Sequence, residues 1–263
     1  MSAPVWDPQQ YLRHADHRTR PFLDLLARVQ GEPARIADLG CGAGNVTALL
    51  ARRFPEARIT GYDNSPQMLE RAAAYASDRL DFVLADAGTW TPGETFDLII
   101  SNALLQWVPG HMDRFPDWVG AVASGGTFAF QVPGNFEAPS HVLMRELAGS
   151  ARWRERVGGV LRHGDAVASP ARYLERLAAL GCDVDAWETT YLHVLEGSDP
   201  VLDWVKGTGL RPVLTALAGD PAGREEFVAE YAGLLREAYP ATEHGTVFPF
   251  RRIFVVARRS AAG

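Results

Sequence analysis

The chain has 263 residues, of which 47% are hydrophobic and 22% charged, and its formal net charge is −6. This composition is typical of a globular protein with a sizeable core and excludes a disordered chain. The acidic balance disfavours a nucleic-acid partner, and we expect neither a membrane-spanning segment nor a signal peptide. Two cysteines far apart, Cys41 and Cys182, predict neither a disulfide scaffold nor a metal site, so we expect a cytoplasmic protein without a metal.

The first predicted elements are an amphipathic helix pair over residues 8–30. Pro21 is expected to start the second helix, where its missing N–H is harmless. Several arginines make this segment basic in an acidic protein. A solvated helix face is one interpretation of these charges. A lid over a ligand is the other.

A buried strand, a tight turn and a helix are predicted around residues 36–44. Asp38 lies in the apolar run, and Gly40, Gly42 and Gly44 follow at alternate positions. Glycines allow positive φ and close approach of a ligand, and a helix N-terminus adds free N–H groups. The pattern fits an ordinary strand-to-helix turn or the site of a nucleotide-like ligand.

Three further strands are predicted over residues 57–63, 80–85 and 96–101. Polar residues stand at or just after their ends, namely Asp63, Asp86 and Asn102. The spacing of the first two strands is that of a βαβ unit, which brings the strand ends to one edge of a parallel sheet. An acid at the second strand end can accept ribose hydroxyls, and Asp86 can accept a hydrogen bond from an exocyclic amine such as that of adenine.

The motifs at these strand ends resemble those of the class I S-adenosylmethionine-dependent methyltransferases. The similar stretches are residues 38–44, 61–69 and 85–87. The resemblance implies a Rossmann-like α/β fold with a mainly parallel seven-stranded sheet, an antiparallel last strand and a helical cover. It also implies S-adenosyl-L-methionine as cofactor and S-adenosyl-L-homocysteine as product.

The expected cofactor-binding residues combine these strand ends with neighbours that the family resemblance implies. They are Tyr11, Arg20, Asp38, Gly40, Gly42, Gly44, Asp63, Asn64, Met68, Asp86, Ala87, Asn102 and Trp107. Met68 fits a core position equally well, and Trp107 fits a packed turn equally well. We expect a helix N-cap at Ser65, with Pro66 as the first helical residue.

The second half of the chain alternates strands with helical insertions. Strands are predicted over residues 125–133, 185–195 and 248–258, with two glycines at the start of the first, and helices over 139–180 and 199–239. We therefore expect a single methyltransferase domain over 1–263. Its parts are an N-terminal helical lid (1–30), a cofactor-binding core (31–135) and a helical cover for substrate (136–182 and 197–245).

The cover segments resemble those of the trans-aconitate 2-methyltransferases, as do residues 6–12, 18–22 and 101–109. The resemblance implies methylation of a carboxylate of trans-aconitate, a small anionic substrate, to the monomethyl ester. The expected substrate-binding residues are His141, Arg145, Tyr191, Trp204, Arg211 and Arg251. Arginine forks match carboxylates, although a surface ion pair explains any single arginine as well.

The expected chemistry uses no catalytic acid or base, because a carboxylic acid is already ionised at neutral pH. Gln106 and Trp107 are expected to help align the reactants. Two other functions stay open: methylation of an oxygen or nitrogen of a natural product, and a binding module without turnover. No nucleic-acid or membrane partner is expected, and the sequence leaves a monomer or a dimer open.

Overall fold

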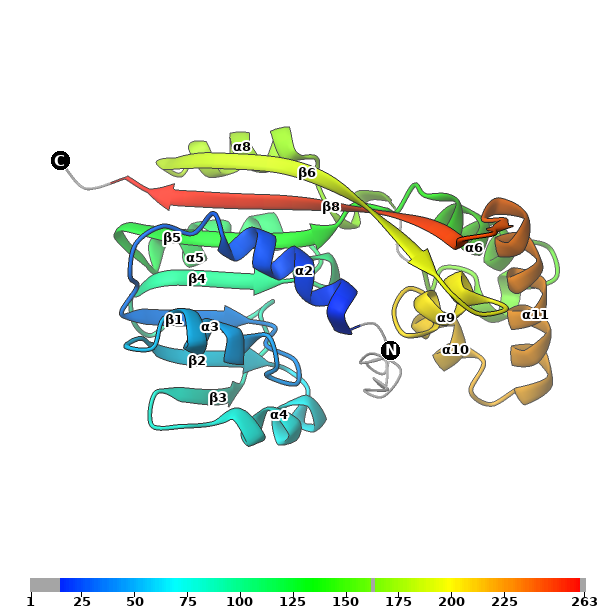
Figure 1. Cartoon of the computed structure of the whole chain (residues 1–263), viewed down its shortest axis with the longest axis horizontal. Coiled ribbons are helices and arrows are strands. Elements are labelled where there is room, and N and C mark those ends of the chain that lie inside the picture. The colour runs from blue at the N-terminus through cyan, green and yellow to red at the C-terminus, as the bar shows by residue number, and fades with distance from the viewer. Residues whose placement is uncertain (1–14, 162–163, 261–263) are drawn as a thin grey trace. The chain divides into compact units, whose positions relative to one another are not determined.

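The computed structural model describes residues 15–161 and 164–260, which build an eight-stranded sheet. The strand order is β3-β2-β1-β4-β5-β8-β6 (Figure 1), and β7 pairs with β8. The strands are β1 (Arg35–Leu39), β2 (Arg58–Asp63), β3 (Leu80–Leu84), β4 (Phe96–Asn102), β5 (Val122–Pro133), β6 (Cys182–Leu195), β7 (Ala241–Thr242) and β8 (Gly245–Arg259).

The pairing of the strands confirms the predicted fold class. β1 runs parallel to β2 and β4, with Ile36 opposite both Ile59 and Leu98. β3 is parallel to β2, β5 is parallel to β4, and β8 is antiparallel to β5. The central strands are apolar because parallel strands are covered on both faces. The two-residue strand β7 is additional to the seven strands that the sequence predicts.

Helices connect the strands or form the insertions. The α-helices are α2 (Ala15–Leu26), α3 (Thr47–Arg53), α4 (Pro66–Ala72), α5 (Phe115–Gly120), α6 (Pro139–Gly149), α7 (Arg154–Val157), α8 (Pro170–Ala178), α9 (Pro200–Lys206), α10 (Arg211–Ala216) and α11 (Pro221–Ala238). Short 3₁₀ helices are η1 (Ala73–Tyr75), η2 (Leu105–Trp107), η3 (His111–Arg114) and η4 (Gly164–Ala166). Among the described helices, none combines the length and the apolar composition needed to cross a bilayer.

Two predictions about proline positions have different outcomes. Ser65 is the N-cap of α4, its Oγ accepts a hydrogen bond from the Met68 amide, and Pro66 follows it, as predicted. Pro21 lies inside α2 instead of starting a helix, so that prediction is wrong. The local signal of a proline is ambiguous, because a helix can continue past a proline when packing holds it. Phe22 and Leu25 next to Pro21 are fully buried and supply that packing.

The two glycines predicted to start the fifth strand lie inside it, because the strand begins three residues earlier. β5 begins at Val122, and its register against β4 shifts between the pairs Phe96–Val122 and Leu98–Thr127. Gly125 has a φ of +76°, and a Cβ at Gly126 would lie 2.8 Å from the Asp97 carbonyl oxygen. The glycines therefore permit an irregularity in the strand.

The chain divides into two compact units. Among the described residues, the helical unit comprises 15–18, 134–161, 164–166 and Thr190–Arg251. The sheet unit comprises Thr19–Pro133, Val167–Thr189 and the described residues 252–260. Most of the predicted cover falls in the helical unit, whereas α8 belongs to the sheet unit.

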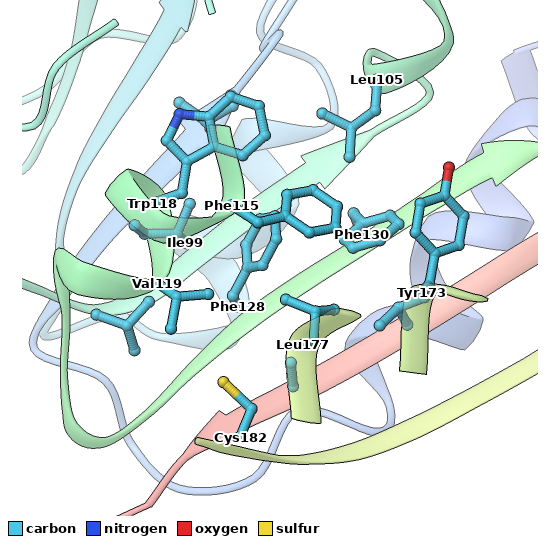
Figure 2. Packing of buried hydrophobic residues seen from close by; sticks show 14 of the residues in the cluster. Ile99, Leu105, Phe115, Trp118, Val119, Phe128, Phe130, Tyr173, Leu177 and Cys182 are labelled. Atoms are coloured by element: carbon cyan, nitrogen blue, oxygen red, sulfur yellow. The ribbon is translucent and has the colours of Figure 1, made fainter. Parts of the chain in front are cut away.

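Aromatic side chains form the core of the sheet unit. The rings of Phe115, Phe128, Phe130 and Tyr173 pack together below Trp118 (Figure 2), and all five residues are at most 1% exposed. Their ring centroids lie 5.0–6.1 Å apart in the pairs that involve Phe115 or Phe130. Burial of each such side chain stabilises the fold by about 1.5–3 kcal/mol. This core fixes β4 and β5, whose ends carry candidate site residues.

The helical unit has a separate core. Trp204 is 1% exposed and contacts Phe248 and Phe250, with ring centroids 5.7 and 5.6 Å away. Trp153 packs edge-on against Phe227 at 5.2 Å. The insertions between the strands thus build a unit with its own apolar interior.

Candidate active site

The turn after β1 is tightly held by backbone hydrogen bonds. The amides of Gly40 and Cys41 both donate to the Tyr62 carbonyl oxygen, at 2.8 and 3.0 Å. Gly40, Gly42 and Gly44 all have positive φ angles, of 76°, 56° and 79°. A Cβ at Gly40 would lie 2.8 Å from the Leu104 side chain, whereas a Cβ at Gly42 would meet nothing within 4 Å. Glycine is therefore required for conformation at all three positions, and the space beside Gly42 stays open for a ligand.

Asp63, at the end of β2, binds this turn directly. Its Oδ2 accepts a hydrogen bond from the Gly42 amide at 2.9 Å, and its Oδ1 accepts one from the Ser65 amide at 2.9 Å. Burial raises the pKa of Asp63, while the amides of Ser65, Gly42 and Asn64 lower it. A carboxylate has about four lone-pair sites, so Asp63 can still accept a hydroxyl donor beside these amides.

Asp38 is a second buried acid, on β1. It is 1% exposed, its Oδ2 accepts a hydrogen bond from Thr47 Oγ1 at 2.7 Å, and its Oδ1 meets no partner within the described part of the chain. Burial raises the pKa of Asp38 to about 7, although the Thr47 bond lowers it. Asp38 is predicted from the sequence as a site residue, whereas Thr47, on the helix after the turn, is not.

The remaining predicted cofactor residues of the sheet unit differ in exposure. Asp86 is exposed and its Oδ1 accepts a hydrogen bond from the Gly88 amide at 2.8 Å. Ala87 is half-buried, Asn64 is exposed, and Met68 is buried on α4, where it serves the core. Arg20 is exposed on α2 and pairs with Asp24 at 3.9 Å. Tyr11 lies outside the described residues.

The loop after β4 has a strained backbone next to Asn102. Ala103 has a φ of +56°, which is uncommon for a residue with a Cβ and typical of functional sites. Gln106 is buried, and its Nε2 donates to the Ala103 carbonyl oxygen at 2.6 Å. Gln106 therefore holds the loop in shape, and Trp107 beside it is half-buried.

Two residues that sequence reasoning missed form a chain of hydrogen bonds that ends at Asn102. Gln131, on β5, donates from Nε2 to Asn102 Oδ1 at 2.5 Å, and Arg252, on β8, donates from Nη1 to Gln131 Oε1 at 3.2 Å. Both are buried, with 1% and 6% exposure. The available signal was Gln131 itself, a polar residue inside an apolar strand. Such a residue predicts a hydrogen-bond partner, because buried polar groups are hydrogen-bonded.

His111 also belongs to the loop after β4. Its Nδ1 lies 3.3 Å from the Val108 carbonyl oxygen, which can only accept, so Nδ1 carries the proton. Nε2 therefore accepts from the Tyr173 hydroxyl at 2.8 Å. Burial lowers the pKa of His111, which favours this neutral form. The contact ties the loop to α8.

The helical unit brings two predicted substrate residues to one pocket. His141 and Arg145 lie one turn apart on α6 and line a pocket with Phe136, Met144, Leu161, Gly209 and Pro212. A Cβ at Gly209 would lie 3.2 Å from His141 Nε2, so the loop before α10 approaches the imidazole closely. Arg145 Nη1 donates to the Phe136 carbonyl oxygen at 2.6 Å, and its Nη2 lies 3.3 Å from Glu137.

The other predicted substrate residues have separate surroundings. Arg211 begins α10, next to Pro212 of the pocket. Arg251 Nη1 donates to the Gly134 carbonyl oxygen at 2.9 Å, close in sequence to Phe136. Tyr191 and Trp204 are buried, and each stacks with the His193 ring, at centroid distances of 6.2 and 4.8 Å. These two aromatic residues support the core of the unit and do not line the pocket.

Residues 36–126 match a family described as a methyltransferase domain. The chain is 68% identical to a trans-aconitate 2-methyltransferase of Streptomyces avermitilis, over 99% of both chains. It is 66% identical to one of Streptomyces coelicolor, over 98% of this chain and 88% of that protein. The chain belongs to the trans-aconitate 2-methyltransferase family.

Solved structures with low sequence identity share the fold of this trans-aconitate 2-methyltransferase family member. The YcgJ protein of Bacillus subtilis has a TM-score of 0.57 and 16% identity, over 94% of this chain and 100% of that one. A phosphoethanolamine N-methyltransferase of Haemonchus contortus, solved with S-adenosylhomocysteine, has a TM-score of 0.54 and 16% identity, over 92% of this chain and 52% of that one. The family identifies the chain as a methyltransferase, as the sequence motifs predicted.

Proposed function

We propose that this enzyme transfers a methyl group from S-adenosyl-L-methionine to one carboxylate of trans-aconitate and releases the monomethyl ester. The observation that carries the proposal is the 68% identity, over nearly the whole chain, to a protein named for that reaction. The glycine turn with its two acids supports the cofactor, and the basic pocket on α6 supports an anionic substrate.

The residues of the sheet unit fit the proposed cofactor. Gly42 leaves open space at the turn, and Asp63 stands beside it with lone pairs for ribose hydroxyls. Asp38 has a buried oxygen without a partner among the described residues, so it can accept a hydrogen bond from a ligand behind the turn. A ligand that carries a sulfonium and an ammonium group would favour the ionised form of this acid. Asp86 is exposed and available to the exocyclic amine of adenine.

The residues of the helical unit fit a polycarboxylate. His141 and Arg145 line one pocket, and Arg211 begins the helix whose next residue lines it too. A trianion that approaches a protein with net charge −6 needs local cations. We propose that these residues and Arg251 neutralise the carboxylates that do not react, with Tyr191 and Trp204 supporting them from the core.

The proposed reaction requires no acid or base from the side chains. The bound cofactor would supply an activated methyl group on a sulfonium. The substrate carboxylate is ionised at neutral pH, so no residue has to remove a proton. The residues of the chain then contribute alignment and exclusion of water. We assign alignment to the loop after β4, where Gln106 fixes the strained Ala103 and Trp107 follows.

A single assay tests the proposal. The protein is incubated with S-adenosylmethionine labelled in the methyl group and with a panel of tricarboxylates, dicarboxylates, phenols and amines. We expect base-labile label in trans-aconitate, because methyl esters hydrolyse in base. Label that resists base, or that enters only a phenol or an amine, would contradict carboxylate methylation.

A further inference from the structure

Three buried or half-buried side chains form a hydrogen-bonded relay at the carboxyl end of β4. Arg252 Nη1 donates to Gln131 Oε1 at 3.2 Å, and Gln131 Nε2 donates to Asn102 Oδ1 at 2.5 Å. Gln131 stands opposite Asn102 in the parallel pairing of β4 and β5. The relay thus leads from a buried cation to the half-buried residue at the strand end.

Only one orientation of the Gln131 and Asn102 amides satisfies these hydrogen bonds. A guanidinium can donate but not accept, so it selects the oxygen of the Gln131 amide. The nitrogen of that amide must then face Asn102, which turns the Asn102 oxygen inward. The Asn102 Nδ2 group lies on the other side of its amide and presents two N–H donors away from Gln131.

The backbone of the same residues holds this arrangement in place. The Ala103 amide donates to the Gln131 carbonyl oxygen at 2.9 Å, and Ala103 has a φ of +56°. Gln131 therefore holds both the Asn102 side chain, at the end of β4, and the strained Ala103 that follows it. Leu104 of the same loop packs against Gly40, so the relay ends at the edge of the sheet that carries the glycine turn.

We propose that Gln131 and Arg252 are positioning residues that set the polarity of the Asn102 amide, so that its N–H groups recognise a carboxylate of a bound ligand. The positive guanidinium polarises both amides and strengthens the last donor. The inference rests on the proposed function, in which two ligands carry carboxylates: the amino-acid part of the cofactor, and the substrate.

Gln131→Glu reverses the polarity without removing the polar contacts. A carboxylate at this position still accepts from Arg252, but it cannot donate to Asn102. The Asn102 amide must then turn its Nδ2 inward and present its oxygen to the ligand. Asn102→Asp gives the same outward oxygen without touching Gln131 and serves as the second variant. Gln30→Glu adds the same charge at an exposed position of the same unit and serves as the control.

The readout is the preference for a carboxylate over a primary amide. Calorimetry gives dissociation constants for S-adenosylhomocysteine and its carboxamide, and inhibition kinetics at saturating cofactor compare trans-aconitate with its monoamides. The unaltered enzyme should prefer the acid in one of these two pairs by on the order of 10- to 100-fold, as for a hydrogen bond to a charged group. The pair whose preference falls in both Gln131→Glu and Asn102→Asp identifies the source of the carboxylate that Asn102 binds.

Gln131→Glu and Asn102→Asp should lose most of that preference and keep their melting temperatures within a few degrees, while Gln30→Glu should keep it. Equal weakening of acid and amide would show a merely structural role and overturn the inference. An unchanged preference in both pairs would overturn it as well. An unaltered enzyme that binds neither S-adenosylhomocysteine nor trans-aconitate would instead contradict the proposed function, and the inference with it.

Discussion

The amide of Gly42 donates a hydrogen bond to Oδ2 of Asp63 at 2.9 Å, which joins the turn after β1 to the acid that ends β2. The other oxygen of the same carboxylate accepts from the Ser65 amide, just before α4. Asp63 is therefore both a candidate ligand for the cofactor and the group that shapes the turn around it. Its loss should affect binding and local structure together.

Asp63→Ala should weaken binding of S-adenosylhomocysteine by about 1.5–3 kcal/mol, because a charge-assisted hydrogen bond is lost. It should also lower the free energy of unfolding by about 1–3 kcal/mol, since two amide donors lose their acceptor. Calorimetry and urea unfolding measure the two effects. Asp81→Ala, at an exposed position of β3, is the control and should change neither. Unchanged affinity in a folded Asp63→Ala protein would remove Asp63 from the cofactor site.

Asp38 should make the unliganded protein less stable as the pH rises. Its pKa is raised from 3.8 to about 7 by burial, so its contribution to stability is complete below pH 3.8 and is lost as the pH rises through about 7. Asp38→Asn cannot ionise and should not lose this contribution. The difference in unfolding free energy between variant and parent should grow by on the order of 4 kcal/mol between pH 4 and 8. Urea unfolding across this range measures it.

Thr47→Val tests the cause of that pH dependence. The Thr47 hydroxyl lowers the pKa of Asp38, so Thr47→Val should raise that pKa further. The free energy of unfolding should then be lower at pH 4 than in the parent, and it should continue to fall up to a higher pH. An Asp38→Asn variant with the same pH dependence as the parent would show that another group is responsible.

Arg211→Lys should impair the enzyme even though the charge is kept. A lysine is a point charge and cannot form the two parallel hydrogen bonds of a guanidinium with a carboxylate. We expect KM for trans-aconitate to rise by roughly tenfold in Arg211→Lys and further in Arg211→Ala, with unchanged binding of the cofactor. Steady-state kinetics decide the point, and Arg224→Lys and Arg224→Ala at an exposed position of α11 are the matched controls. Kinetics equal to those of the parent would place Arg211 outside the substrate site.

The rate should depend little on pH above about pH 6, because the carboxylate nucleophile is already ionised. Turnover at saturating trans-aconitate and cofactor, measured from pH 6 to 9, should be nearly flat. A steep bell in this range would indicate a general base, and so a hydroxyl or amine substrate.

Tyr173→Phe should destabilise the sheet unit at neutral pH. The change removes the hydroxyl that donates to His111 Nε2 and leaves a buried acceptor without its partner, which costs about 1–3 kcal/mol. Thermal and urea unfolding measure the loss, and Tyr75→Phe, which is 43% exposed in the parent, is the control. A stability equal to that of the control variant would show that the contact contributes nothing.

The stability that neutral His111 contributes should also fall as the pH falls. Burial lowers the pKa of His111, so its stabilising contribution is complete above its ordinary pKa of 6.5 and is lost as the pH falls through the lowered value. Between the two pKa values, the parent should therefore lose stability on acidification. His111→Gln should lose less over the same interval, since its side chain does not titrate.

The sequence by itself determined the features that depend on residues close together in the chain. The glycines at 40, 42 and 44, the cap at Ser65 and the apolar runs of the central strands all follow from local conformational preference and periodicity. Acids at strand ends then located one edge of a parallel sheet, because βαβ units bring such ends together. Pro21 failed as a signal, since a proline marks a helix boundary only when packing does not hold the helix through it.

Only the tertiary structure decided which distant side chains meet. Gln131 and Arg252 are separated by 121 positions, and His111 and Tyr173 by 62, so neither pair leaves a pattern in the sequence. The same holds for the substrate candidates: packing gave His141 and Arg145 a shared pocket and placed Tyr191 and Trp204 in the core. The physical reason is that polarity of a residue predicts that it needs a partner, whereas the partner is chosen by strand register and by the close packing of side chains.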